Sequence, residues 1–291
     1  MFKDYMSALK QEFHGYNVQT LMQDLLAGLT VAAVALPLAL AFGVSSGADA
    51  GAGLITAIIA GLVIGVLSGA SYQISGPTGA MSAILIGLST TYGLQGVFIA
   101  SFLSGCMLII ASLFKFGKIV SFIPTSVITG FTSGIAIIIA LGQIDNFFGT
   151  TSVGSSALEK LFSYTKLGFP ISLPTAFFGA LVVVIMILWP KKWGEYCPSS
   201  LAGIIIALIC QLCLNLPVHE VGTIPSTLFP EARLSFSSLQ LSTITQLMLP
   251  ALSIAALGMI ESLICGASAG KMKNEKLNAD RELMAQGIGN M

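Results

Sequence analysis

The sequence predicts an all-α protein that crosses a membrane several times. Of its 291 residues, 55% are hydrophobic and only 9% are charged, whereas soluble proteins average about 25% charged residues. So few charges cannot cover a water-facing surface of this size. The hydrophobic residues also fall into runs long enough to span a bilayer. We therefore expect a multi-pass protein of the cell membrane, with eight crossings and the lipid bilayer around them.

The same composition excludes several classes of function. The formal net charge is zero, which argues against nucleic acid as a partner. His14 and His219 are the only histidines and lie outside the hydrophobic runs, so we expect no histidine metal site. Cys210 and Cys213 have C-x-x-C spacing within a continuous apolar run, where packing is the favoured role. We find no catalytic pair and no phosphate-binding loop, and so expect neither an enzyme nor a cofactor.

The hydrophobic runs divide the chain in order. Residues 1–24 mix charged with apolar residues and predict an amphipathic segment at the membrane surface, with Asp24 as the N-cap of the first span. The first seven spans lie within 25–216, at Leu25–Phe42, Ala50–Leu67, a broken segment ending at Tyr92, Leu94–Phe114, Ser126–Leu141, Pro174–Trp189 and Leu201–Leu216. An extracytoplasmic loop at 217–246, an eighth span at 247–267 and a basic cytoplasmic segment at 268–291 follow.

Proline and glycine punctuate these spans. Pro37 lies deep inside the first span and is expected to kink or break its helix. Pro124 is expected to open the fifth span. In the second span, Gly61, Gly65 and Gly69 recur at every fourth position, which predicts a bare face that packs closely on a neighbouring helix.

The third span is expected to be broken near the middle of the membrane. Residues Tyr72–Pro77 have the character of a short strand, and the apolar run Ala80–Tyr92 predicts a half-helix of about 20 Å. The two together are long enough for one crossing of about 30 Å. The half-helix would point its free backbone N–H groups and positive dipole end at Thr78 and Gly79, which is an anion site if it lies inside the membrane. A plain turn outside the membrane is the alternative.

The basic residues support the membrane crossing of this short segment. With the N-terminus inside and eight crossings, ten of the thirteen Lys and Arg residues fall inside and three fall outside, the three being Lys160, Lys166 and Arg233. Such a bias is the expected one. Without the third crossing, every later loop would change sides. The count therefore predicts a cytoplasmic N-terminus and a third segment that spans the membrane.

One carboxylate stands apart from the others. Twelve of the thirteen Asp and Glu residues lie in loops, tails or span ends, whereas Glu261 lies inside the eighth span, beside Ser262 and one turn before Cys265. A charge at mid-membrane costs about 2.5–3.5 kcal/mol on insertion scales. We therefore expect Glu261 to face a cavity, bind a cation or carry a proton. A structural glutamate that is hydrogen-bonded across helices is the alternative.

With these residues in view, the chain resembles the sulfate permease (SulP) family of anion transporters, and in particular its bacterial bicarbonate-transporter branch. The matching stretches are Asp24–Thr30, Leu36–Phe42, Gln73–Gly79, Pro124–Gly134 and Asn278–Gly287. The resemblance implies two inverted seven-span repeats, with a core domain that moves as an elevator against a gate domain, usually followed by a cytosolic STAS domain, and it implies a homodimer. It also implies that the anion binds between half-helices three and ten.

By this resemblance, five residues belong to the anion site. Thr78, Gly79 and Ala80 would donate hydrogen bonds to the anion, and Phe42 with Leu38 would line the pocket from the first span. Glu261 stands where the bicarbonate branch has an aspartate that helps to bind sodium, and Cys265 stands where it has a threonine. The coupling group is therefore Glu261 with Ser262 and Cys265, and the coupled ion is either H⁺ or Na⁺. Leu38 replaces a glutamine that is common in other branches.

The resemblance ends in the middle of a motif. We expect the chain to hold the first seven-span repeat plus span eight, and so to lack the second half of the anion site and to be unable to transport alone. Two other classes of function remain open, which are a nucleobase permease of the same architecture and a non-transporting or channel-like membrane component. Sulfate, bicarbonate, dicarboxylate and chloride all remain open as the anion, because backbone donors select charge better than identity.

Overall fold

The chain folds into helices that form two groups. The computed structural model describes residues 5–7, 9–10, 13–118, 125–154, 157–194, 197–218, 234 and 241–291. These residues include helices but no strand, which confirms the all-α prediction. Among them, four helices are long and apolar enough to cross a membrane, and three shorter apolar helices accompany them at Ser133–Phe148, Leu173–Leu188 and Ser199–Leu214.

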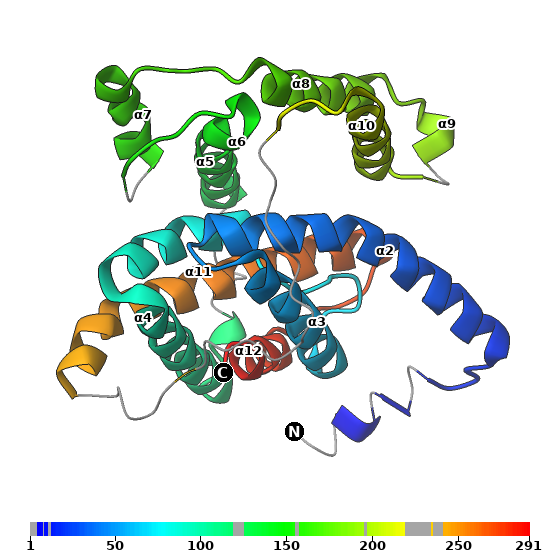
Figure 1. Ribbon diagram of the computed structural model, residues 1–291. Coiled ribbons are helices and arrows are strands. Elements are labelled where there is room, and N and C mark those ends of the chain that lie inside the picture. Colours follow the sequence, from blue (N-terminus) through cyan, green and yellow to red (C-terminus); the bar gives the residue numbers. More distant parts are fainter. Residues whose placement is uncertain are drawn as a thin grey trace.

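The first group carries most of the buried residues. It consists of α2 (Val18–Ser45), α3 (Ala50–Leu67), α4 (Gly79–Leu113), α11 (Leu241–Lys273) and α12 (Ala279–Gly289), which lie together in the lower half of Figure 1. Helix α4 packs against both α11 and α12, and α2 packs against α3. Their core includes Leu88, Ile99, Leu108, Ile254 and Leu263, each at most 6% exposed.

The second group lies above the first in Figure 1 and comes from the middle of the chain. It consists of α5 (Thr125–Gly142), α6 (Ile144–Phe148), α7 (Ala157–Leu167), α8 (Leu173–Leu188), α9 (Lys191–Gly194) and α10 (Ser199–Leu214). Helix α8 packs against α6 and α10, while α5 touches α4 and α10 touches α2. The predicted opener of the fifth span, Pro124, and the charged residues His219, Glu220, Glu231 and Arg233 lie outside the described residues.

Helix α2, which contains the predicted first span, begins earlier than the sequence suggested. Asn17 caps it, because its Oδ1 accepts a hydrogen bond of 2.9 Å from the backbone N–H of Thr20. The prediction that Asp24 is the N-cap was wrong, since Asp24 lies inside α2 and accepts a hydrogen bond of 2.7 Å from the Tyr16 hydroxyl. The helix continues through Pro37 to Ser45. Pro37 therefore does not break the span.

Close packing of α2 on α3 depends on glycines other than the predicted ones. A Cβ atom at Gly53 would lie 2.0 Å from the Ala39 carbonyl oxygen, and one at Gly43 would lie 2.5 Å from the Asp49 carbonyl oxygen. At Gly65 nothing lies within 4 Å, and at Gly61 the nearest atom is 3.7 Å away. The predicted glycine face was therefore wrong at Gly65, and Gly61 faces the non-helical Ser75 and no neighbouring helix, because the side of α3 that meets α2 is the one that carries Gly53. Gly69, the third predicted glycine, does approach another backbone, since a Cβ there would lie 2.1 Å from the Asn278 carbonyl oxygen.

The half-helix prediction is confirmed in α4. Gly93 has φ +67° and ψ −176°, the only non-helical residue inside α4, and it divides the helix into Gly79–Tyr92 and Leu94–Leu113. Glycine tolerates a positive φ at little steric cost. The predicted end of the half-helix at Tyr92 and the predicted start of the fourth span at Leu94 both agree with this division.

Candidate functional site

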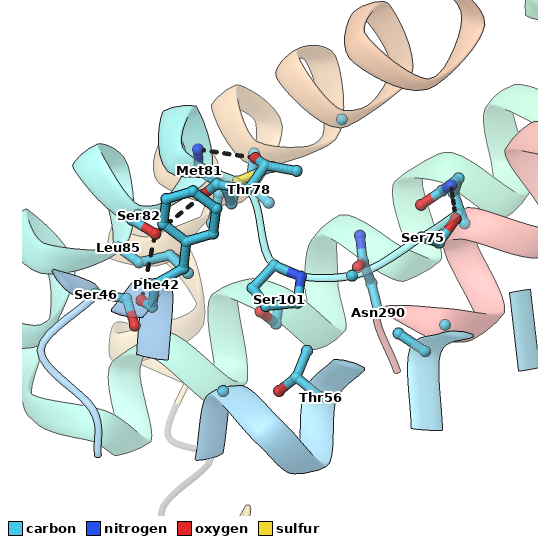
Figure 2. A pocket seen from close by; sticks show the side chains of 18 of the residues that line it. Phe42, Ser46, Thr56, Ser75, Thr78, Met81, Ser82, Leu85, Ser101 and Asn290 are labelled. Atoms are coloured by element: carbon cyan, nitrogen blue, oxygen red, sulfur yellow. Dashed lines mark hydrogen bonds between the residues drawn. The ribbon is translucent and has the colours of Figure 1, made fainter. Parts of the chain in front are cut away.

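The site is built around the segment that links α3 to α4. Residues 68–78 are neither helix nor strand, so the prediction of a short strand at Tyr72–Pro77 was wrong. A strand needs a partner for its backbone, and this segment instead lies against helices, where a Cβ at Gly61 would be 3.7 Å from the Ser75 carbonyl oxygen. Figure 2 shows it passing from Ser75 to Thr78, where α4 begins.

Thr78 is the residue that turns this segment into a helix. Its backbone is extended, with φ −118° and ψ 151°, and its Oγ1 accepts a hydrogen bond of 3.2 Å from the Met81 backbone N–H. The Ser82 hydroxyl donates to the Thr78 carbonyl at 2.9 Å and lies 3.3 Å from the Phe42 carbonyl (Figure 2). Threonine is a good N-cap residue. The positive end of the half-helix is thereby fixed beside α2.

A cavity of about 320 Å³ opens at this helix end. The broken segment, α2, α3, α4 and α11 contribute to its walls, and so do Gln286 and Gly289 of α12 and the C-cap of that helix, Asn290. Five predicted site residues line it, namely Phe42, Thr78, Glu261, Ser262 and Cys265. The sequence thus identified residues that lie more than 180 positions apart and that the fold brings into one cavity.

Three predicted site residues do not line this cavity. Leu38 is 48% exposed and Ala80 is buried, and neither belongs to the cavity wall. Gly79 lines a second cavity of about 210 Å³. A Cβ at Gly79 would lie 3.1 Å from the Phe42 ring, so glycine allows this ring to pack on the start of α4. Phe42 and Ser82 line both cavities.

The centre of the cavity joins a hydroxyl to a carboxylate. The Thr78 hydroxyl donates a hydrogen bond of 3.1 Å to Glu261 Oε2, and Cys265 lies on the next turn of α11. The N-terminus of α4 and the Glu261 carboxylate therefore border the same space. The first attracts an anion and the second attracts a cation or a proton. Among the described residues, no three His, Cys, Asp or Glu side chains gather as a metal site.

The predicted site residues did not include several polar side chains at this site, among them Ser82, Glu282 and Gln286. Ser82 and Gln286 line the cavity, and Glu282, which had been counted among the carboxylates outside the spans, is fully buried beneath it. Glu282 and Gln286 lie one helical turn apart in α12, so the spacing of polar residues in a short helix was the available signal.

Comparison with known proteins identifies the family. The pattern that defines the sulfate permease family matches residues 21–291. The chain belongs to the sulfate permease family. It is 38% identical over 289 residues to the putative sulfate transporter YvdB of Bacillus subtilis, covering 96% of this chain and 53% of that protein. It is 30% identical over 282 residues to the bicarbonate transporter BicA of Synechocystis, covering 94% and 50% respectively.

The chain spans about half the length of these curated relatives. Among solved structures, it matches the transmembrane domain of a cyanobacterial bicarbonate transporter BicA with a TM-score of 0.82 and 31% identity, over 93% of this chain and 70% of that one. Murine Slc26a9, an anion transporter, shares the fold at a TM-score of 0.80 and 18% identity, over 100% of this chain and 53% of that one. The resemblance seen in the sequence is confirmed, and the relatives are transporters rather than enzymes.

Proposed function

We propose that this chain is part of a secondary active transporter of small inorganic anions of the sulfate or bicarbonate class, coupled to H⁺ or Na⁺. The observation that carries the proposal is the hydrogen bond of 3.1 Å between Thr78 and Glu261 across the cavity. It places the positive end of a half-helix and an acidic side chain side by side. The relatives supply the class of anion, since they are a putative sulfate transporter and a bicarbonate transporter.

Electrostatics explains why such a pair would couple two ions. An anion within about 4 Å of an ionised Glu261 would be repelled by roughly 4 kcal/mol at an effective dielectric constant of about 20. A proton or a Na⁺ ion on Glu261 removes this repulsion, so that each ion favours binding of the other. The hydroxyls of Thr78 and Ser262 are the additional oxygen atoms that a Na⁺ ion would use, and the neighbouring thiol of Cys265 is a poor ligand for it.

The proposal also includes the orientation of the protein in the membrane and its assembly into a homodimer. The distribution of basic residues supports a cytoplasmic N-terminus, and the resemblance supports a homodimer. By the resemblance, the anion would bind between the start of α4 and a second half-helix, and the chain spans about half the length of its relatives. Reconstituted alone in liposomes, residues 1–291 are therefore expected to give no saturable anion uptake.

Uptake into proteoliposomes tests the proposal. Protein expressed from the complete gene is assayed with labelled sulfate and labelled bicarbonate, with a Na⁺ gradient, a pH gradient or neither. Glu261→Gln keeps the shape of the side chain but can neither bind a cation strongly nor change its protonation. We expect it to reduce gradient-driven uptake by roughly 5–150-fold, the usual range of a coupling energy.

The matched control is Glu275→Gln, which makes the same chemical change at an exposed carboxylate. It should keep the gradient dependence of the wild type. Gradient dependence that survives in Glu261→Gln would contradict the coupling role and favour a structural glutamate. If the wild type takes up neither anion under any gradient, the proposed function itself is wrong.

A further inference from the structure

We propose that Glu282 is a positioning residue for this site, resting on the proposed function. Its buried carboxylate ties the segment before α4 to α11 and α12, and so sets the positions of Thr78 and Glu261 relative to each other. Glu282 itself does not line the cavity. It is 0% exposed, the only charged side chain among the buried residues of the described chain.

One oxygen of the carboxylate gathers three side chains. Glu282 Oε1 accepts hydrogen bonds from Gln73 Nε2 at 2.5 Å, from the Ser262 hydroxyl at 2.7 Å and from Gln286 Nε2 at 2.9 Å. These donors belong to the non-helical segment, to α11 and to α12. A single atom therefore joins the three parts of the chain that form this side of the cavity.

The other oxygen holds the end of α3. Glu282 Oε2 accepts from the Ser68 hydroxyl at 2.5 Å and from the Gly69 backbone N–H at 3.0 Å. We call these partners, together with Gln73, Ser262, Glu282 and Gln286, the Glu282 cluster. A buried carboxylate is costly unless its lone pairs are satisfied, and five donors satisfy this one. A neutral side chain of the same shape cannot accept all five.

The backbone around the cluster leaves no room for α12 to shift. A Cβ at Gly69 would lie 2.1 Å from the Asn278 carbonyl oxygen, and the Asn278 backbone N–H donates to the Gly69 carbonyl at 3.0 Å. On the other side, a Cβ at Gly105 of α4 would lie 2.6 Å from the Gly287 carbonyl oxygen. Helix α12 is therefore held between the end of α3 and the second half of α4, and Glu282 has a fixed position.

The Glu282 cluster is connected to the Thr78–Glu261 pair along the chain in two places. Ser262 is the neighbour of Glu261 in α11. Gln73 lies five residues before Thr78 in the non-helical segment, and Gln286 holds this segment at a second point, by donating to Ser75 Oγ at 3.1 Å. Both members of the Thr78–Glu261 hydrogen bond thus stand on chain segments that the cluster fixes.

The orientation of Gln73 shows that the carboxylate dictates the arrangement. Its amide nitrogen faces Glu282 and also lies 3.1 Å from Ser262 Oγ. Its Oε1 is left buried without a hydrogen-bond partner among the described residues, close to Gly266, where a Cβ would be 3.3 Å from it. An unpaired buried oxygen is unfavourable. The hydrogen bond between the Gln73 amide nitrogen and the Glu282 carboxylate offsets this cost and keeps the amide in this orientation.

The test compares Glu282→Gln with Glu275→Gln. The control removes a carboxylate that accepts a hydrogen bond of 2.6 Å from the Tyr72 hydroxyl, right beside Gln73, but at the surface. In protein expressed from the complete gene, we expect Glu282→Gln to raise the KM for the anion roughly 10–100-fold, the loss that a displacement of about 1 Å causes. The control should keep the KM of the wild type.

Exchanging the two side chains of Gln73 and Glu282 distinguishes a positioning role of Glu282 from a role in packing alone. The double variant Gln73→Glu with Glu282→Gln restores one carboxylate–amide bond with its direction reversed. It should lower the KM part of the way from its value in Glu282→Gln, because the other four donors still face a neutral side chain. A KM that stays at the wild-type value in Glu282→Gln, with only thermal stability reduced, would overturn the proposal. If Glu282→Gln does not fold, Ser68→Ala removes one donor away from the cavity and should still raise the KM.

A second readout does not depend on transport. Cys265 lines the cavity, so its rate of alkylation by a maleimide reports the position of α11 in a variant in which every other cysteine is replaced by serine. We expect Glu282→Gln to change this rate and Glu275→Gln to leave it unchanged. A changed rate in a protein that transports no anion would support the positioning role while contradicting the proposed function. Equal rates in both variants would contradict the positioning role.

Discussion

The two groups of helices are held together in different ways. In the first group, glycines bring backbones into contact at Gly43, Gly53 and Gly69, and a buried carboxylate joins segments that are far apart in the sequence. In the second group, the described residues of α8 include none that is buried. Contacts between aromatic rings are common there instead, with Phe148 lying 4.9 Å from Phe147 and 5.3 Å from Phe169.

This difference shows which part of the molecule has to keep its shape. The cavity lies within the first group, where a small displacement would separate Thr78 from Glu261. The second group contributes no residue to the larger cavity and meets the first where α5 touches α4 and α10 touches α2. The division matches the core and gate domains that the family resemblance implies.

The largest expected effect breaks the close packing of the first group. In Gly53→Val, the new side chain would overlap the Ala39 carbonyl, where a Cβ already comes within 2.0 Å. Because backbone cannot yield as a side chain can, we expect a loss of about 3 kcal/mol or more, or failure to fold. Gly65→Val adds the same atoms to the same helix, where nothing lies within 4 Å, and should change stability by less than about 0.5 kcal/mol.

Thermal unfolding of the purified protein in detergent, followed with size-exclusion profiles, measures both variants. Equal unfolding temperatures would show that the close contact between the backbones of α2 and α3 at Gly53 is not needed for stability. A stronger effect at Gly65 would mean that the predicted glycine face packs after all.

An intermediate effect is expected where the two cavities meet. Phe42 lines both, so Phe42→Ala should join them and allow ions to pass without coupling. We expect faster uptake in the absence of a gradient and a weaker response to one, measured in the same proteoliposomes. Leu29→Ala, on the exposed side of α2 at 69% exposure, should match the wild type. Unchanged coupling in Phe42→Ala would show that the ring does not separate the two spaces.

The smallest effect is expected in the second group. The Tyr164 hydroxyl donates a hydrogen bond of 2.8 Å to Asp145 Oδ1, and partial burial together with this bond raises the pKa of Tyr164 above its ordinary value of 10.0. Tyr164→Phe should cost about 0.5–1.5 kcal/mol, measured as a lower unfolding temperature. Tyr92→Phe, at an exposed tyrosine of α4, is the control.

The pH dependence of this contribution has a definite sign. The folded state holds the phenol proton more tightly than the unfolded state, so the stabilisation is complete below pH 10.0, the ordinary pKa. It is lost as the pH rises through the higher pKa of the folded state. The stability difference between wild type and Tyr164→Phe should therefore shrink in alkaline solution. A difference that grows with pH would contradict this assignment.

Local signals in the sequence predicted the broken span well. Pro77 and Gly93 bracket the half-helix, and because proline and glycine limit helices through their own backbones, the predicted bounds Ala80–Tyr92 agree with the structure to within one residue. Glu261 was recognisable for a similar reason, since a carboxylate inside an apolar run stands out without any tertiary information.

Features that depend on packing partners were missed. Which glycines of α3 meet another backbone depends on the side from which α2 approaches, and the sequence of α3 alone does not contain that information. Glu282 looked like a surface carboxylate because its partners Ser68 and Gln73 lie more than 200 positions earlier. The short strand at Tyr72–Pro77 was predicted from residue type, although the part of the chain that the structure describes contains no second strand to pair with it.

During synthesis, Gln73 enters the membrane long before its partner Glu282 has been made. Glu282 follows Gln73 by 209 positions and follows Ser68, which also donates to it, by 214 positions. Contacts between such distant residues form late in folding. Until residue 282 has been made and α12 has docked, the polar groups of the broken span must be satisfied by water, lipid headgroups or the insertion machinery. The first helices therefore have to persist in the bilayer as an unfinished bundle, and a chain delayed at this stage would expose its most polar segment to degradation.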